Sequence, residues 1–263
     1  MSRFAQLVAL CAVAGGAMIA ATGQSATPAQ ASAAQSFTDL RDFDTVVLRG
    51  PDNVVVTRGS GFSVHAEGDP KAIAMLDISV RDGTLIVSRK RQDRGNWHWN
   101  DKGATIRVTL PALRRATLAG SGDMSVDAMK GATVEAQILG SGDLRIGGIA
   151  AQDAKLSLTG SGDLTIGGVD AQAAEMGITG SGTLTIAGTV RSTSVSIAGS
   201  GDVLADRLAA LTTTVRIAGS GNAHVRASQS ADVSLAGSGD AMVRGTRNCT
   251  LSKHGSGEAH CAV

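Results

Sequence analysis

A four-residue pattern, Gly-Ser-Gly followed by a polar residue, recurs at a nearly constant interval through the second half of the chain. The spacings between successive copies are 20, 20, 20, 19, 20, 18 and 18 residues. The first Gly of each copy is Gly120, Gly140, Gly160, Gly180, Gly199, Gly219, Gly237 and Gly255. A fixed interval near 20 residues is typical of solenoids, in which each repeat forms one coil of a stack.

Apolar residues alternate with polar or small residues on both sides of each Gly-Ser-Gly. Two residues before the first Gly stand Leu118, Ile138, Leu158, Ile178, Ile197, Ile217 and Leu235, and the last copy has Lys253 there instead. Similar columns stand four residues before and six residues after the same Gly. Because alternation with period two indicates strands with one buried face, we predict two or three short strands per coil.

A string of β-hairpins, which would give an antiparallel sandwich or barrel, also fits Gly-rich turns between strands. The constant coil length favours a stack, since it keeps each inward column in register with the next coil. We therefore predict an all-β fold, a parallel β-solenoid (β-helix) with coils of about 20 residues. Its coils should occupy residues 116–263, and residues 35–115 should form N-terminal strands and a cap loop.

The repeated Gly-Ser-Gly-Asp is better explained as a corner than as an active site. It lacks the spacing of the G-x-S-x-G nucleophile elbow and the Lys of a phosphate loop. We predict that the eight glycines are structural turns, and that Ser and Asp side chains bond to backbone N–H groups at the corner. The alternative is a calcium ladder, but one carboxylate per coil supplies few of the six to eight oxygens that calcium takes.

Residues 1–34 have the features of a secretory signal peptide. Arg3 precedes an apolar run at 7–21, and small residues follow near Ala29–Gln35. The run is shorter than the ~20 residues of a membrane span, and no later segment could cross a bilayer. We expect a periplasmic or secreted protein that is associated with the cell envelope.

Charge and composition exclude one class of partner. Without Arg3 the chain has 23 basic and 23 acidic residues, so it offers no general attraction to nucleic acid. It has no Tyr, and apart from Phe4 its aromatic residues all lie between positions 37 and 99. The coils must therefore bury aliphatic side chains alone.

Residues 89–103, RKRQDRGNWHWNDKG, interrupt the strand pattern. Trp97 and Trp99 would point to the same side of an extended segment, and with Arg91 and Arg94 they could stack on sugars or lipid headgroups. These four residues are our candidate ligand-binding site. The alternative, which we favour, is that the segment covers the open end of the solenoid.

The two cysteines after the signal peptide both occupy inward columns of the last coil. Cys249 and Cys261 could form a disulfide that pins this coil, provided that their Cα atoms lie within ~7 Å of each other. The pattern leaves both outcomes open. His254, Glu258 and His260 stand near the same corner, but alternation turns His260 outward and Cys261 inward, so we predict no metal site and no cofactor.

Three stretches together resemble a known family. They are FDTVVLRGPDNVVVTRGSGFSVHAEGD at 43–69, DGTLIVS at 82–88, and IRVTLPALRRATLAGSGD at 106–123, followed by the Gly-Ser-Gly coils. This order is similar to that of the family named putative auto-transporter adhesin, head GIN domain. The resemblance implies a bacterial exported protein with a right-handed β-solenoid and an adhesive role. It covers the chain from residue 35 to residue 263, which we take as one domain.

The expected function is a non-catalytic binding or scaffold module of the cell envelope. The partner would be an envelope glycan or protein, and uncapped coil ends could also support homo-oligomers. The alternative is a β-helix polysaccharide lyase or hydrolase. Such enzymes concentrate Asp with Arg or Lys in one groove, whereas the outward basic residues of this chain are spread along the coils: Arg145, Arg191, Arg216, Arg226 and Arg244.

Overall fold

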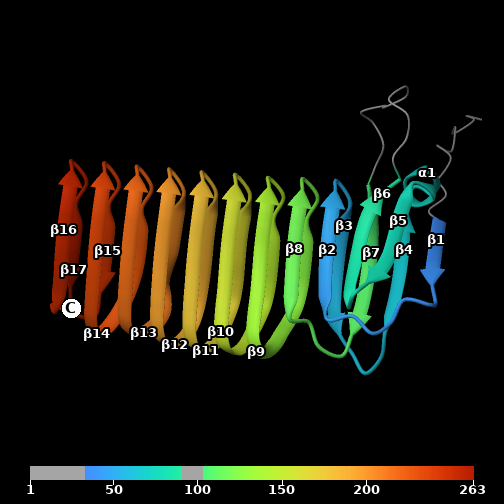
Figure 1. Ribbon diagram of the computed structural model, residues 1–263, viewed down its shortest axis with the longest axis horizontal. Helices are drawn as coiled ribbons and strands as arrows, with labels where there is room; N and C mark the ends of the chain where they lie inside the picture. Colours follow the sequence, from blue (N-terminus) through green and yellow to red (C-terminus); the bar gives the residue numbers. More distant parts are fainter. Residues whose placement is uncertain (1–32, 91–102) are drawn as a thin grey trace, which may run out of the picture. The chain divides into compact units, whose positions relative to one another are not determined.

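The computed structural model describes residues 33–90 and 103–263, which form strands and one short helix (Figure 1). The N-terminal elements are β1 (Ala33–Phe37), β2 (Thr45–Gly50), β3 (Asn53–Arg58), β4 (Ser63–Gly68), α1 (Pro70–Ala74), β5 (Leu76–Arg81), β6 (Thr84–Arg89), β7 (Ala104–Leu110) and β8 (Arg115–Gly120). The coil strands are β9 (Met124–Gly140), β10 (Leu144–Gly160), β11 (Asp163–Gly180), β12 (Thr183–Gly199), β13 (Asp202–Gly219), β14 (Ala223–Gly237), β15 (Ala241–Arg244), β16 (Cys249–Gly255) and β17 (Ala259–Ala262).

Each of the strands β9 to β14 forms almost a whole coil. They are 15 to 18 residues long, and each pairs in parallel with the strands of the coils before and after it. The predicted parallel β-solenoid is confirmed, with about seven turns. The prediction of two or three short strands per coil is wrong for β9 to β14, whereas the next coil does consist of two short strands, β15 and β16. In β9, β10 and β11 the coils bend at the same residues, so the ladder continues through the bend, as at Gly148 opposite Gly168. From β11 to β14 the register shifts at the bend.

The core is a set of aliphatic columns inside the stack. The column two residues before each corner is fully buried from Leu118 to Leu235, and so is the column six residues after it from Val126 to Val243. In the last coil, Leu251 is 50% exposed, because β16 pairs with β14 alone among the described strands. Burial therefore follows from stacking, and the last coil has a neighbour on one side only.

At both glycines of each corner a Cβ would collide with the backbone of the preceding coil, and the first glycine also has a positive φ. The first has a φ between 127° and 153° in all eight copies, a region that other residues rarely adopt. The second has an ordinary φ, but a Cβ there would lie closer than 3.0 Å to a backbone oxygen of the preceding coil. Close stacking of the corners thus excludes any side chain at the second position.

The coil pattern begins earlier than the sequence analysis recognised. Gly50 pairs with Gly120, and β3 pairs with β9 in the same parallel register as the later coils. The residues LRGPDN at 48–53 therefore form a corner equivalent to LAGSGD. The signal was present in the sequence, but Pro51 and Asp52 replace Ser and the second Gly and hide it.

The N-terminal end of the stack is closed by antiparallel strands and the helix. β4 pairs with β7 and β1 pairs with β4, both antiparallel. Asp69 caps α1 by accepting a hydrogen bond from the Lys71 N–H, and α1 buries Ala72 and Ile73. β1 begins at Ala33, two residues before the predicted start of the folded domain. In the described residues the end is therefore covered by regular structure.

Candidate functional site

The polar residues of the corners form a hydrogen-bonded ladder along the stack. Each carboxylate or amide oxygen accepts the backbone N–H of its counterpart in the next coil, at 2.7 to 3.2 Å. The exception is Asp202, whose N–H donates to the Gly182 carbonyl because Thr183 precedes it in the column. The predicted bonds from corner Asp side chains to the backbone therefore form between coils.

The corner serines use their backbone rather than their side chains. From Ser121 to Ser238, each corner Ser N–H donates to the carbonyl of the first Gly one coil earlier, and the hydroxyl groups face solvent. In the last corner the Gly257 N–H makes this bond instead. In the described corners, the one bond between Ser hydroxyls joins Ser238 and Ser256 at 3.1 Å. The predicted Ser side-chain bonds to the corner backbone are thus not formed. Within the described residues, no three His, Cys, Asp or Glu side chains gather as a metal site would require.

A buried ion pair stands where the segment between β6 and β7 leaves the stack. Asp52 is 1% exposed and accepts two bonds from Arg89, the last residue of β6, both at 2.8 Å. The same carboxylate accepts the N–H of Ala104, the first residue of β7, at 2.9 Å. One side chain therefore holds both ends of the inserted segment.

This pair was not predicted from the sequence. Asp52 occupies the position of a second corner Gly, and the departure from Gly is the signal that could have revealed it. Four predicted ligand-binding residues, Trp97, Trp99, Arg91 and Arg94, lie outside the described residues. The predicted cover over the solenoid end falls on the same segment.

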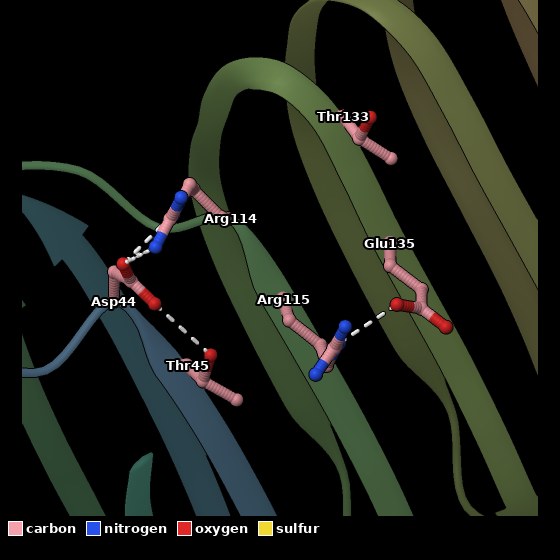
Figure 2. Close-up of a pocket in the computed structure, with 6 residues that line it drawn as sticks. All are labelled: Asp44, Thr45, Arg114, Arg115, Thr133 and Glu135. Atoms are coloured by element: carbon pink, nitrogen blue, oxygen red, sulfur yellow. Dashed lines mark hydrogen bonds and ion pairs between the residues drawn. The ribbon is translucent and has the colours of Figure 1, made fainter. Parts of the chain in front are cut away.

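A shallow hollow of about 240 Å³ lies where β2, β8 and β9 run side by side (Figure 2). Its lining residues are Asp44, Thr45, Arg114, Arg115, Thr133 and Glu135. Arg114 donates to Asp44, with Nε 2.7 Å from Oδ2, and Arg115 donates to Glu135 over the same distance. Asp44 also accepts the Thr45 hydroxyl at 3.1 Å. Each charge in the hollow is thus matched by an opposite charge.

The internal pairing limits the chemistry of this hollow. Both carboxylates already accept hydrogen bonds from guanidinium groups. The lining has no His, Cys or Ser, and the Thr45 hydroxyl donates to Asp44. The hollow therefore groups acidic with basic residues in two ion pairs.

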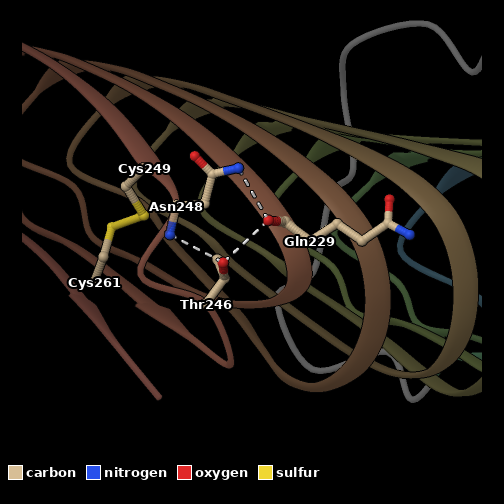
Figure 3. The surroundings of a disulfide bond; sticks show 5 residues. All are labelled: Gln229, Thr246, Asn248, Cys249 and Cys261. Carbon is tan, nitrogen blue, oxygen red and sulfur yellow. Dashed lines mark hydrogen bonds between the residues drawn. A yellow bond between two sulfur atoms is a disulfide. The ribbon is translucent and has the colours of Figure 1, made fainter.

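Cys249 and Cys261 form a disulfide across the last coil (Figure 3). Their Cα atoms are 6.6 Å apart, within the reach of a disulfide. Beside them, Thr246 Oγ1 donates to the Gln229 carbonyl at 3.1 Å, and the Asn248 side chain donates to the same oxygen at 3.3 Å. The disulfide and these bonds tie the last coil to itself and to β14.

Replacing both cysteines with Ser should loosen the last coil only. The disulfide closes a loop with a sequence separation of 12, and a crosslink of this size contributes about 2 to 4 kcal/mol. Because coils interact mainly with their neighbours, amide exchange should accelerate in β16 and β17 and stay unchanged in β10 and β11. Equal acceleration in all four strands would contradict this expectation.

The outward basic residues do not form one groove. Arg145 pairs with Asp143 at 2.9 Å, whereas Arg191 and Arg216 stand exposed on other parts of the coil surface. Arg226 and Arg244 lie opposite each other on β14 and β15. Among the described residues, no helix combines the length and the apolar character of a membrane span.

The stacked coils, closed at their N-terminal end by antiparallel strands, define a parallel β-solenoid. The family described as "Putative auto-transporter adhesin, head GIN domain" matches residues 42–246, and the chain belongs to this family. The resemblance predicted from the sequence is therefore confirmed. No curated protein matches the chain.

Solved structures share the fold. A putative lipid-binding protein from Parabacteroides distasonis ATCC 8503 is 23% identical, with 88% of this chain and 96% of that chain covered and a TM-score of 0.80. A putative adhesin from the same organism is 20% identical, with 89% and 97% covered and a TM-score of 0.81. A putative adhesin from Parabacteroides merdae ATCC 43184 is 18% identical, with 88% and 96% covered and a TM-score of 0.78. At these identities the likeness shows the fold alone.

Proposed function

We propose that this chain is a non-catalytic binding module of the bacterial cell envelope, which recognises a glycan or a protein through the segment inserted between β6 and β7. The observation that carries the proposal is the Asp52 clamp. A buried carboxylate that holds both Arg89 and Ala104 fixes the two ends of the insertion on a rigid coil. Binding residues on loops that a rigid scaffold positions are a recurrent arrangement.

The residue types of the insertion suit recognition. Trp97 and Trp99 supply flat apolar faces for sugar rings, and Arg91 and Arg94 supply charge-assisted hydrogen bonds. The family and two of the similar structures are named as adhesins, which supports binding of an external molecule. These residues are proposed as the ligand contacts.

The export that we predict from the sequence fits the same role. Residues 1–34 have the pattern of a signal peptide, and a disulfide such as Cys249–Cys261 persists in oxidising compartments such as the periplasm or the exterior. We place the protein in the periplasm or outside the cell, in association with the envelope. The balanced charge of the chain argues against nucleic acid as its partner.

A glycan array probed with the full chain tests this proposal. The variant Trp97→Ala/Trp99→Ala should bind at least about tenfold more weakly than the natural chain, because two stacking contacts are lost. The control Leu139→Ala/Leu211→Ala removes two exposed apolar side chains from the coils and should bind normally. Unchanged binding by the Trp variant would refute the proposed site. Cleavage of an acidic polysaccharide by the natural chain would favour the lyase alternative.

A further inference from the structure

Two arginine side chains face each other near the C-terminal end of the stack. Arg226 of β14 lies opposite Arg244 of β15 in the parallel register. Val225 and Val243 beside them are fully buried, so the arginines point outward. Within the strand pairs that the structure describes, this is the one register pair that joins two Arg or Lys residues. Like charges directly opposite each other are destabilising in a sheet.

The surrounding side chains balance this charge in part. Asp206 of β13 has its Oδ1 3.8 Å from Nε of Arg244 and its Oδ2 3.6 Å from Nδ1 of His224. Its Oδ1 is buried without a hydrogen-bond partner. In the described residues, no carboxylate lies within 4.0 Å of the Arg226 guanidinium. Two arginines and one aspartate leave a net positive charge.

The pairing of arginines is not imposed by the repeat. Asp206, Arg226 and Arg244 each stand seven residues after the first Gly of a corner, where the coils from 140 to 187 have Gly147, Gly167 and Ala187. The corner ladder also stacks like charges, but each Asp there accepts a backbone N–H from the next coil. Within the described part of the chain, the side chains of Arg226 and Arg244 form no hydrogen bond between their coils that would offset the repulsion between them. An anionic ligand bound to both would relieve that repulsion.

We propose that Arg226 and Arg244 bind successive anionic groups of an acidic polysaccharide that lies across β14 and β15. This inference rests on the proposed binding function and adds a second contact surface, separate from the insertion, and a ligand class. Guanidinium groups bind carboxylates and sulfates in bidentate fashion. The two arginines stand on adjacent strands, which lie about 5 Å apart, and this spacing suits charges repeated along a linear polymer.

Other polyanions fit this surface less well. A nucleic acid would need basic residues over a longer track, but the column supplies two arginines and is neutral or acidic in the preceding coils, with Asp127 and Asp206 as its acidic members. Binding to an anionic membrane would be helped by several apolar side chains that insert into it. Near this cluster in sequence, β13 offers one exposed large apolar residue, Leu204, which is 39% exposed. The acidic polysaccharide is therefore the favoured occupant.

Binding of dextran sulfate, with uncharged dextran as the reference, tests the inference on the full chain. The variant Arg226→Ser/Arg244→Ser should bind dextran sulfate at least about tenfold more weakly, because charge-assisted hydrogen bonds are lost. The matched control Arg191→Ser/Arg216→Ser removes the same charge from exposed positions elsewhere and should stay within about twofold of the natural chain. Asp206→Asn should bind more tightly, since it removes the competing carboxylate.

The variant Arg226→Ser/Arg244→Ser should fold, because the substitution relieves the repulsion between the two arginines. Its thermal unfolding midpoint should equal or exceed that of the natural chain. Equal losses of affinity in both double variants would overturn the inference and show attraction by overall charge. Equally tight binding of a DNA oligonucleotide or of phosphatidylglycerol vesicles would overturn the polysaccharide assignment. Loss of binding only in Trp97→Ala/Trp99→Ala would overturn this site and leave the proposed function intact. Failure of the natural chain to bind any glycan would refute this inference, and the proposed function would then rest on a protein partner.

Discussion

Substitution of Gly162 by Ala should lower the free energy of unfolding by about 3 kcal/mol or more, because the added methyl group overpacks the corner. Gly162 is the second glycine of its corner and has an ordinary φ, so backbone strain does not enter. Its Cβ would come closer than 3.0 Å to the Gly142 carbonyl oxygen, which is backbone and cannot rotate away. Chemical denaturation followed by circular dichroism measures the effect.

The matched control is Gly168→Ala in the same coil. A Cβ at Gly168 meets no atom within 4 Å, and its φ is also ordinary. Alanine there restricts the unfolded chain and should leave stability unchanged or raise it by up to about 1 kcal/mol. If both substitutions cost the same, close stacking of the corners would not be the reason for the second glycine.

Substitution of Asp52 by Ala should cost about 3 to 5 kcal/mol, because it removes one partner of a buried ion pair. Arg89, whose side chain is 16% exposed, loses both of its hydrogen bonds to Asp52. The Ala104 N–H loses its acceptor as well. Amide exchange at Ala104 and Thr105 should accelerate, and the denaturation midpoint should fall.

Asp44→Ala provides the comparison for Asp52→Ala. Asp44 pairs with Arg114 at the hollow, where the two side chains are 37% and 60% exposed. Exposed ion pairs contribute about 0 to 1 kcal/mol, so this variant should be close to the natural protein in stability. Equal losses for Asp44→Ala and Asp52→Ala would show that burial does not set the strength of the clamp.

Much of the coil architecture could be predicted from the order of residues. The columns ending at Leu235 and Val243 were identified from alternation, and both are buried as expected. The number of strands per coil could not be predicted, because Gly147 and Gly148 by themselves suggest that the strand ends there. Whether the ladder continues through that bend depends on the neighbouring coil.

The candidate site was harder to predict, because it consists of departures from the repeat. The clamp joins Asp52 to Arg89, 37 residues away, and the pair is recognisable only when β2 and β6 lie side by side. Arg226 and Arg244 were counted among basic residues spread along the coils. Their direct opposition appears once the register of β14 and β15 is known.

The sequence alone determined the period, the inward columns and the corner positions, because these follow from local alternation and from backbone preferences of glycine. Tertiary structure decided which residues from different coils meet. A hydrogen bond from Asp163 N–H to Asp143, the disulfide between Cys249 and Cys261, and the opposed arginines each depend on register between strands. Register is a property of the stack, since a shift of one residue turns every side chain to the other face.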